Sequence, residues 1–147
     1  MSIRFTAGAV ALGLFTAASV AAELPTTSLT INGNKLTAEV ATTTATRATG
    51  LMNRFSLKPD HGMLFIYEQP QPLAFWMRNT YVALSIAFIG GDGRIVDIQD
   101  MQPQTEDTHW SRVPAQFALE MKKGWFAERG IVAGDTVKGL PTASAKR

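Results

Sequence analysis

The feature that most constrains the fold is a period of two among the apolar residues from Gly62 onward. Leu84, Ile86 and Phe88 alternate with small residues, and 63–67 is a short apolar run. Runs of this length, bounded by glycine turns such as 90–93, are typical of β-strands. The sequence therefore predicts a mainly β fold, a compact β-sandwich or barrel-like single domain with one or two short helices.

The expected elements follow from local signals. Asn32-Gly33 favours a tight hairpin because both residues tolerate positive φ. Helical spacing predicts a short helix near Thr43 to Met52 and a helical turn near Gly124 to Arg129. The stretch 102–115 is polar and bounded by prolines, so a surface loop is expected there. Strands are expected at 29–31, 35–40, 63–67, 73–77, 84–88, 94–98, 117–121 and around 136–137.

The first 22 residues have the layout of a secretory signal peptide. Arg4 precedes an uncharged apolar stretch, and small residues end at Ala21 and Ala22. We expect cleavage there, a periplasmic or secreted mature protein, and no stable membrane insertion afterwards. The remaining boundaries are expected at 23–34 for a leader and first strand, 35–140 for the β domain, and 141–147 for a disordered tail.

Composition excludes several classes of function. The chain has no cysteine, so disulfides, thiol catalysis and thiolate metal sites are ruled out. A net charge of +2, with no basic stripe, argues against a nucleic-acid partner. His61 and His109 lack the spacing of a ligand set, so we expect no metal and no cofactor.

Several ordered blocks resemble the DUF192 family of uncharacterised bacterial and archaeal proteins. The blocks are Gly50-Leu51-Met52 with Arg54 and Leu57, Gly62-Met63-Leu64-Phe65, Phe75-Trp76-Met77-Arg78-Asn79-Thr80, Gly93-Arg94-Ile95, Leu119-Glu120, Gly124-Trp125, Arg129-Gly130-Ile131 and Gly134-Asp135. The resemblance covers Lys35 to about Lys138 and implies a compact, mostly β single domain, often exported, with no established activity. Relatives usually carry an acid where this chain has Ser85.

Strand parity suggests a candidate binding face. If Phe75 and Met77 point into the core, Trp76 and Arg78 share the opposite face. If Leu84, Ile86 and Phe88 are core, Ala83, Ser85 and Ala87 lie opposite. If Phe117, Leu119 and Met121 are core, Ala118 and Glu120 lie opposite, and the non-core face would hold Glu120 with Trp76 and Arg78 among small residues. We expect binding residues at Trp76, Arg78 and Glu120, with Arg54 and Asn79 nearby.

Two functions are compatible with these residues. The first is a binding or interaction module for an envelope component such as a glycan or peptide, because an indole beside polar groups suits such ligands. The alternative is a hydrolase of a polysaccharide or another envelope component, with Glu120 as acid or base. A purely structural role also stays open, in which Arg78 and Glu120 pair across the sheet. We expect Glu120 to be paired with Arg78 or Arg54.

Overall fold

The computed structural model describes residues 23–142 of the chain. The expected signal peptide at 1–22 and residues 143–147 of the expected tail lie outside the described residues. The elements in chain order are β1 (Thr26–Ile31), β2 (Asn34–Ala41), α1 (Thr44–Thr49), β3 (His61–Gln71), β4 (Ala74–Phe75), β5 (Leu84–Ile89), β6 (Ile95–Met101), β7 (His109–Trp110), β8 (Ala115–Lys122), the 3-10 helix η1 (Ala127–Arg129) and β9 (Val137–Lys138).

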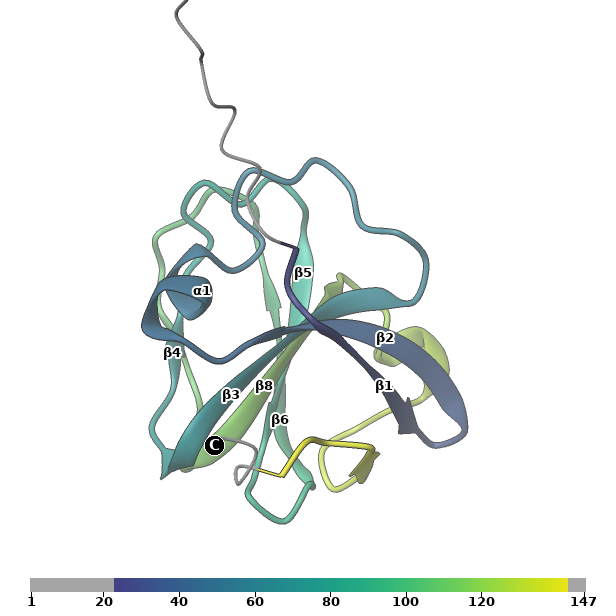
Figure 1. The fold of residues 1–147 in the computed structure, drawn as a ribbon. Coiled ribbons are helices and arrows are strands. Elements are labelled where there is room, and N and C mark those ends of the chain that lie inside the picture. The colour runs from purple at the N-terminus through teal and green to yellow at the C-terminus, as the bar shows by residue number, and fades with distance from the viewer. Residues whose placement is uncertain (1–22, 143–147) are drawn as a thin grey trace, which may run out of the picture.

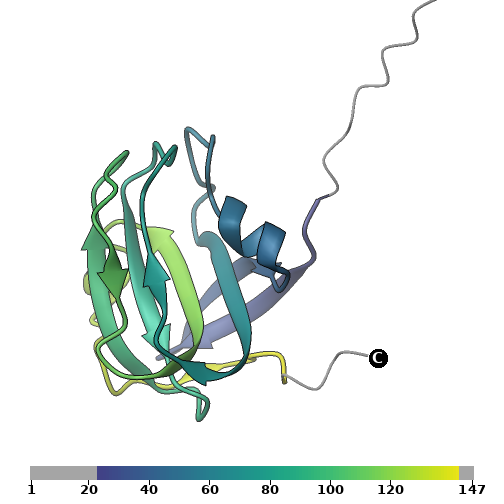
Figure 2. The ribbon, with the colours of Figure 1, turned by 90° about the vertical axis from the view of Figure 1, so that its left-hand side faces the viewer.

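Seven strands form one curled sheet in the order β6-β5-β8-β3-β2-β1-β9, and β4 pairs with β7 in a separate two-stranded sheet. The large sheet curls into a half-barrel, which Figures 1 and 2 show from two sides. Arg94 forms a β-bridge with Thr136, so the chain next to β6 also meets the chain next to β9. The predicted mainly β, barrel-like single domain is confirmed.

The predicted hairpin joins β1 and β2 through Asn32 and Gly33, whose φ angles are 48° and 78°. β2 then runs parallel to β3, from Thr37 opposite His61 to Ala41 opposite Phe65. Parallel neighbours need a crossover connection, and that connection contains α1. The crossover places the helix beside the sheet, as Figure 2 shows.

α1 is shorter than the predicted helix. It begins after Thr43, whose hydroxyl accepts from the backbone N–H of Thr46 at 3.1 Å, while the Thr43 N–H donates to the Thr46 hydroxyl at 3.0 Å. This reciprocal pair satisfies two free helix-end groups. The helix ends at Gly50, where φ is 47° and an added Cβ would lie 3.4 Å from the Phe65 ring. Gly50 thus turns the chain in a backbone conformation that residues with a side chain rarely adopt.

The apolar residues form two cores, one on each face of the central strands. Leu64, Ala87, Leu119 and Met121 belong to one core, together with residues of β1 and β2. Phe65, Phe75, Leu84, Ile86, Phe88 and Ala118 belong to the other. The central strands are covered on both faces, so every residue of β5 is buried. Glu120 lies opposite Ile86 in the register of β8 and β5, and therefore faces the second core.

Smaller differences concern element ends. β3 extends through Pro70, where a loop was expected, and β4 is only two residues long. The polar stretch 102–115 is mostly loop but contains β7. The helical turn expected near Gly124 to Arg129 is present as η1. Within residues 23–142, no helix combines the length and apolar character needed to span a bilayer.

Candidate functional site

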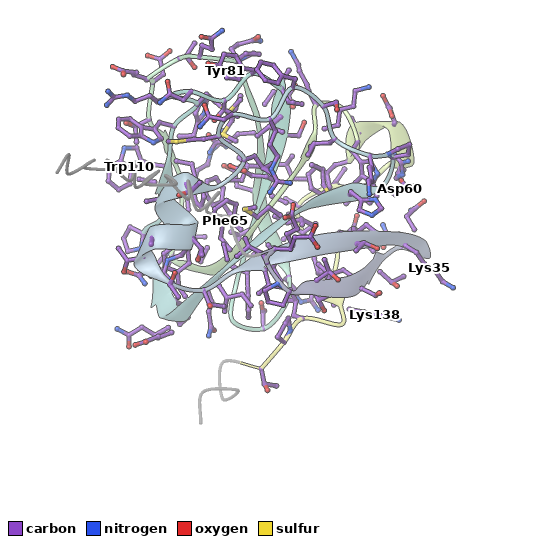
Figure 3. The ribbon with its side chains drawn as sticks, turned by 45° about the horizontal axis from the view of Figure 1, so that its top comes forward. Lys35, Asp60, Phe65, Tyr81, Trp110 and Lys138 are labelled. Carbon is purple, nitrogen blue, oxygen red and sulfur yellow. The ribbon has the colours of Figure 1, made fainter. Side chains whose placement is uncertain are left out.

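A pocket of about 340 Å³ lies between α1 and the sheet. Figure 3 shows Phe65 beside α1, with Trp110 toward the same side of the molecule and Asp60 on the other. The lining combines aromatic rings with few charged groups. It is formed by Thr44, Arg47, Ala48, Thr49, Gly50, Leu51, Met52, Phe65, Tyr67, Ala74, Phe75, Trp76, Thr80 and Glu120. The pocket therefore joins the Gly50 block, β3, the Trp76 segment and β8.

Glu120 reaches this pocket from the centre of β8 and is only 4 % exposed. Within residues 23–142, no hydrogen bond or ion pair reaches its carboxyl group. Every side-chain N or O atom sealed from solvent in that range has a partner, so the Glu120 oxygens are open to the pocket. Burial raises the pKa of Glu120 to about 8, because desolvation disfavours the charged form.

The expected pairing of Glu120 with an arginine is therefore wrong. Arg54 binds Glu39 of β2 through two hydrogen bonds, one of them 2.9 Å long. Arg78 lies beside Glu106, with its Nε 3.5 Å from a carboxylate oxygen. Both arginines therefore pair with other acids, and the side chain of Glu120 faces the pocket instead of either arginine.

Trp76 is where parity placed it. Phe75 and Met77 are buried, whereas Trp76 is 45 % exposed and lines the pocket. The guanidinium carbon of Arg78 lies 5.5 Å from the centre of the Trp76 ring. Arg78 thus holds one side of the indole by a cation–π contact, without lining the pocket itself. The structure brings Trp76 and Glu120 to one site, with Arg78 at its edge.

Arg54 and Asn79 do not line this pocket. Arg54 borders a separate groove with Glu39 and Leu57, and the hydrogen bond with Glu39 raises its pKa. Asn79 has φ 53°, and its carbonyl accepts from the N–H of Asn53 at 2.8 Å. Asn79 therefore builds the turn that joins the Trp76 segment to the chain after α1.

Arg47 and Tyr67 are site residues that the sequence reasoning missed. The Arg47 guanidinium donates to the carbonyls of Thr42 and Ile66, the latter at 3.0 Å. It also lies 4.5 Å from the centre of the Tyr67 ring, and burial raises the pKa of Tyr67. Tyr67 alternates with Phe65 along β3, which is a signal that could have placed both on one face. No such pattern could have identified Arg47, because its position depends on how the chain between β2 and β3 folds back beside the sheet.

Comparison with known proteins places the chain in a family. The DUF192 family model, described as an uncharacterized ACR, matches residues 27–139. The chain belongs to the DUF192 family. Two solved structures are similar: a protein described as a proposed transcription regulator from Sinorhizobium meliloti 1021 and a protein of unknown function from Novosphingobium aromaticivorans DSM 12444.

The matches to the two solved structures extend over most of the chain. The Sinorhizobium protein is 33 % identical, with a TM-score of 0.78, and the match covers 81 % of this chain and 97 % of that one. The Novosphingobium protein is 34 % identical, with a TM-score of 0.73, and the match covers 86 % and 99 %. No curated protein matches the chain.

Ser85 is the departure noted from the DUF192 pattern. Its hydroxyl donates to a carboxylate oxygen of Asp100 at 2.6 Å and accepts from the Gly124 N–H at 3.0 Å. Ser85 lies opposite Met121 in the strand register, whereas Ile86 lies opposite Glu120. Ser85 and Glu120 therefore face opposite sides of the sheet, and the missing acid at 85 has no bearing on the partners of Glu120.

The histidines and Asp135 have structural contacts. His61 Nδ1 lies 2.7 Å from the Pro59 carbonyl oxygen, and His109 Nδ1 lies 3.3 Å from Gln99. Asp135 accepts from the N–H of Val132 and from Asn32, so it closes a turn as its position before a strand suggests. In the described part of the chain, no group of three histidine, cysteine or acidic residues could hold a metal ion.

Proposed function

We propose that this DUF192 protein is an exported binding module that holds a small envelope component, such as a glycan or peptide fragment, in the pocket between α1 and the sheet. The observation that carries the proposal is Glu120. It is an almost fully buried carboxyl group without a partner in residues 23–142, and it is open to a pocket. Buried acids in proteins are usually paired, because an unpaired one costs stability. A ligand that supplies the missing partner would explain why the acid is there.

The rest of the pocket suits a ligand with both apolar and polar parts. Trp76 offers an exposed indole face, and Arg78 fixes that ring from outside the pocket. Thr44 and Thr80 add small polar side chains to the lining. Aromatic plates with a few oriented polar groups are the usual design of small-ligand sites.

Hydrolysis has less support than binding. A carboxyl group with a raised pKa could act as a general acid near neutral pH. The usual glycosidase mechanism, however, needs a second carboxylate facing the same bond. The described residues that line the pocket include Glu120 as their one carboxyl group. A nucleic-acid partner, such as a transcription regulator would have, also has little support from the near-neutral charge.

Replacing Trp76 with alanine is expected to weaken ligand binding by about tenfold or more, because an aromatic anchor of this kind contributes a few kcal/mol. Isothermal titration calorimetry with peptidoglycan fragments, oligosaccharides and short peptides measures the effect, because Trp76 is itself the tryptophan that lines the pocket. Trp110→Ala is the matched control, since Trp110 is also exposed but does not line the pocket. A Trp76→Ala variant that binds every ligand of the parent equally well would rule out this pocket as the binding site.

Export is tested on the protein from its own host. Because Arg4, the apolar stretch and Ala21-Ala22 have signal-peptide layout, the mature chain is expected to begin at Ala22 or Glu23. Mass spectrometry of the intact protein and of its N-terminal peptide gives the answer. A soluble cytoplasmic product that retains Met1 to Ala21 would contradict export.

A further inference from the structure

We propose that the ligand binds in the pocket with a protonated amine, and that this amine pairs with the carboxylate of Glu120. This inference rests on the proposed binding function and names the chemical group that the site recognises. It covers two sources of the same chemistry, the amino terminus of a peptide and an amino sugar.

The carboxyl group of Glu120 has unmet hydrogen-bonding capacity within residues 23–142. A carboxylate can accept about four hydrogen bonds, and no described residue donates one to it. An ammonium group carries three donors and a positive charge, so a single ligand group could meet most of that capacity. A hydroxyl or amide would leave the carboxyl group either protonated or uncompensated.

The walls of the pocket are aromatic. Phe65, Tyr67, Phe75 and Trp76 line the pocket together with Glu120. Aromatic faces attract cations and do so more strongly where water is excluded. An acid in a pocket with four aromatic side chains is therefore better matched to an amine than to a neutral or anionic group.

Two other charged or titratable groups line the pocket. Arg47 reaches it from α1 and Tyr67 from β3, whereas β4 and the residue after it contribute Ala74, Phe75 and Trp76. Arg47 is already held by two backbone carbonyls and the Tyr67 ring, and it forms no ion pair with Glu120. The site thus keeps a positive and a negative group apart, and a ligand with both an amine and a carboxylate would meet both.

Proton release accompanies this mode of binding. Because burial raises the pKa of Glu120 to about 8, the free protein carries a proton on Glu120 at pH 7. An entering ammonium group stabilises the carboxylate, so that proton leaves to the buffer. About one proton should be released per ligand at pH 7, and affinity should rise with pH only up to about 8, because the amine of the ligand loses its own proton there.

The test is isothermal titration calorimetry with four probes at pH 7: alanyl-alanine and N-acetyl-alanyl-alanine, and glucosamine and N-acetylglucosamine. Repeating each titration in two buffers with different ionisation enthalpies counts the released protons. The free amines are expected to bind about tenfold or more tightly than their acetylated forms, as a charge-assisted hydrogen bond allows. Alanyl-alanine is expected to bind more tightly than glucosamine if Arg47 meets its carboxylate.

Glu120→Gln separates the inference from the proposed function. In this variant the preference for free amines and the proton release should both disappear, while circular dichroism reports a folded protein. Acetylated probes that bind as well as free amines, or a preference that survives Glu120→Gln, would overturn the amine inference and leave the pocket as the binding site. Failure of all four probes would also overturn it. The loss of binding in Trp76→Ala remains the separate test of the pocket.

Discussion

The protein should become less stable as the pH rises from about 5 to 8, and Glu120→Gln should remove that loss. Folded Glu120 holds its proton up to about pH 8, whereas an unfolded chain releases it near the ordinary value of 4.5. Between these values the folded state binds one more proton than the unfolded state. Stability from this group is therefore complete below about pH 4.5 and is lost as the pH approaches 8. The unfolding constant should change by up to about tenfold per pH unit.

Urea unfolding of the parent and of Glu120→Gln at a series of pH values measures this effect. Other titrating groups are common to both proteins, so the difference between their free energies of unfolding isolates Glu120. Glu106→Gln is the control, because Glu106 is exposed and lies beside Arg78. If the parent and Glu120→Gln followed parallel curves from pH 5 to 8, Glu120 would not be a buried neutral acid.

Gly62→Ala is expected to lower the free energy of unfolding by about 3 kcal/mol or more, near the upper end for an overpacked core. Gly62 lies in β3, where an added Cβ would be 2.1 Å from the backbone oxygen of Glu120 and 2.4 Å from the Met121 sulfur. The first of these atoms is backbone in the neighbouring strand, so β8 itself would have to move. The same displacement would disturb the position of Glu120 in the pocket.

Thermal or urea unfolding tests the Gly62 prediction. Gly130→Ala provides the matched control, since Gly130 has φ 64° and open space around its Cα. That variant should lose only about 1 kcal/mol, the cost of a non-glycine residue in this conformation. If Gly62→Ala were as stable as Gly130→Ala, β8 could shift at this point at little cost in free energy, and the prediction would be wrong.

Local signals predicted the local structure. Asn32-Gly33 determines a turn through its own backbone preferences, and the alternation of Leu84, Ile86 and Phe88 identifies a strand without knowledge of its neighbours. Thr43 and Gly50 mark the ends of α1 for similar reasons, although the predicted helix extended too far toward Met52. Each of these features depends on residues a few positions apart.

The two-sided burial of the sheet could not be read from parity. Alternation along β8 separates Leu119 from Glu120, but it does not say whether the second face meets solvent or another layer. Here the second face is covered by apolar residues of β4 and its flanking segments, such as Leu73, Phe75 and Met77, and α1 lies at its edge. Glu120 is consequently buried, although a polar residue at that parity suggested an exposed one.

The ion-pair partners of the charged residues could also not be predicted from the sequence. Arg54 pairs with Glu39, and their contact exists because β2 and the chain after α1 are brought together by the parallel crossover. Arg47 reaches the pocket for the same reason. Trp76 and Glu120 line the same pocket, but Glu120 faces the second core and not the non-core face that parity predicted.

The central claim is that Glu120 is an unpaired, neutral acid in a ligand pocket, and its titration by NMR tests this most directly. The carboxyl carbon of Glu120, assigned by comparison with Glu120→Gln, can be followed from pH 4 to pH 10 in the free protein. A midpoint near 8 is expected, because burial penalises the charged form and the described residues offer it no partner. A midpoint at or below the ordinary value of 4.5 would mean that Glu120 is ionised and stabilised inside the protein, and would contradict the account.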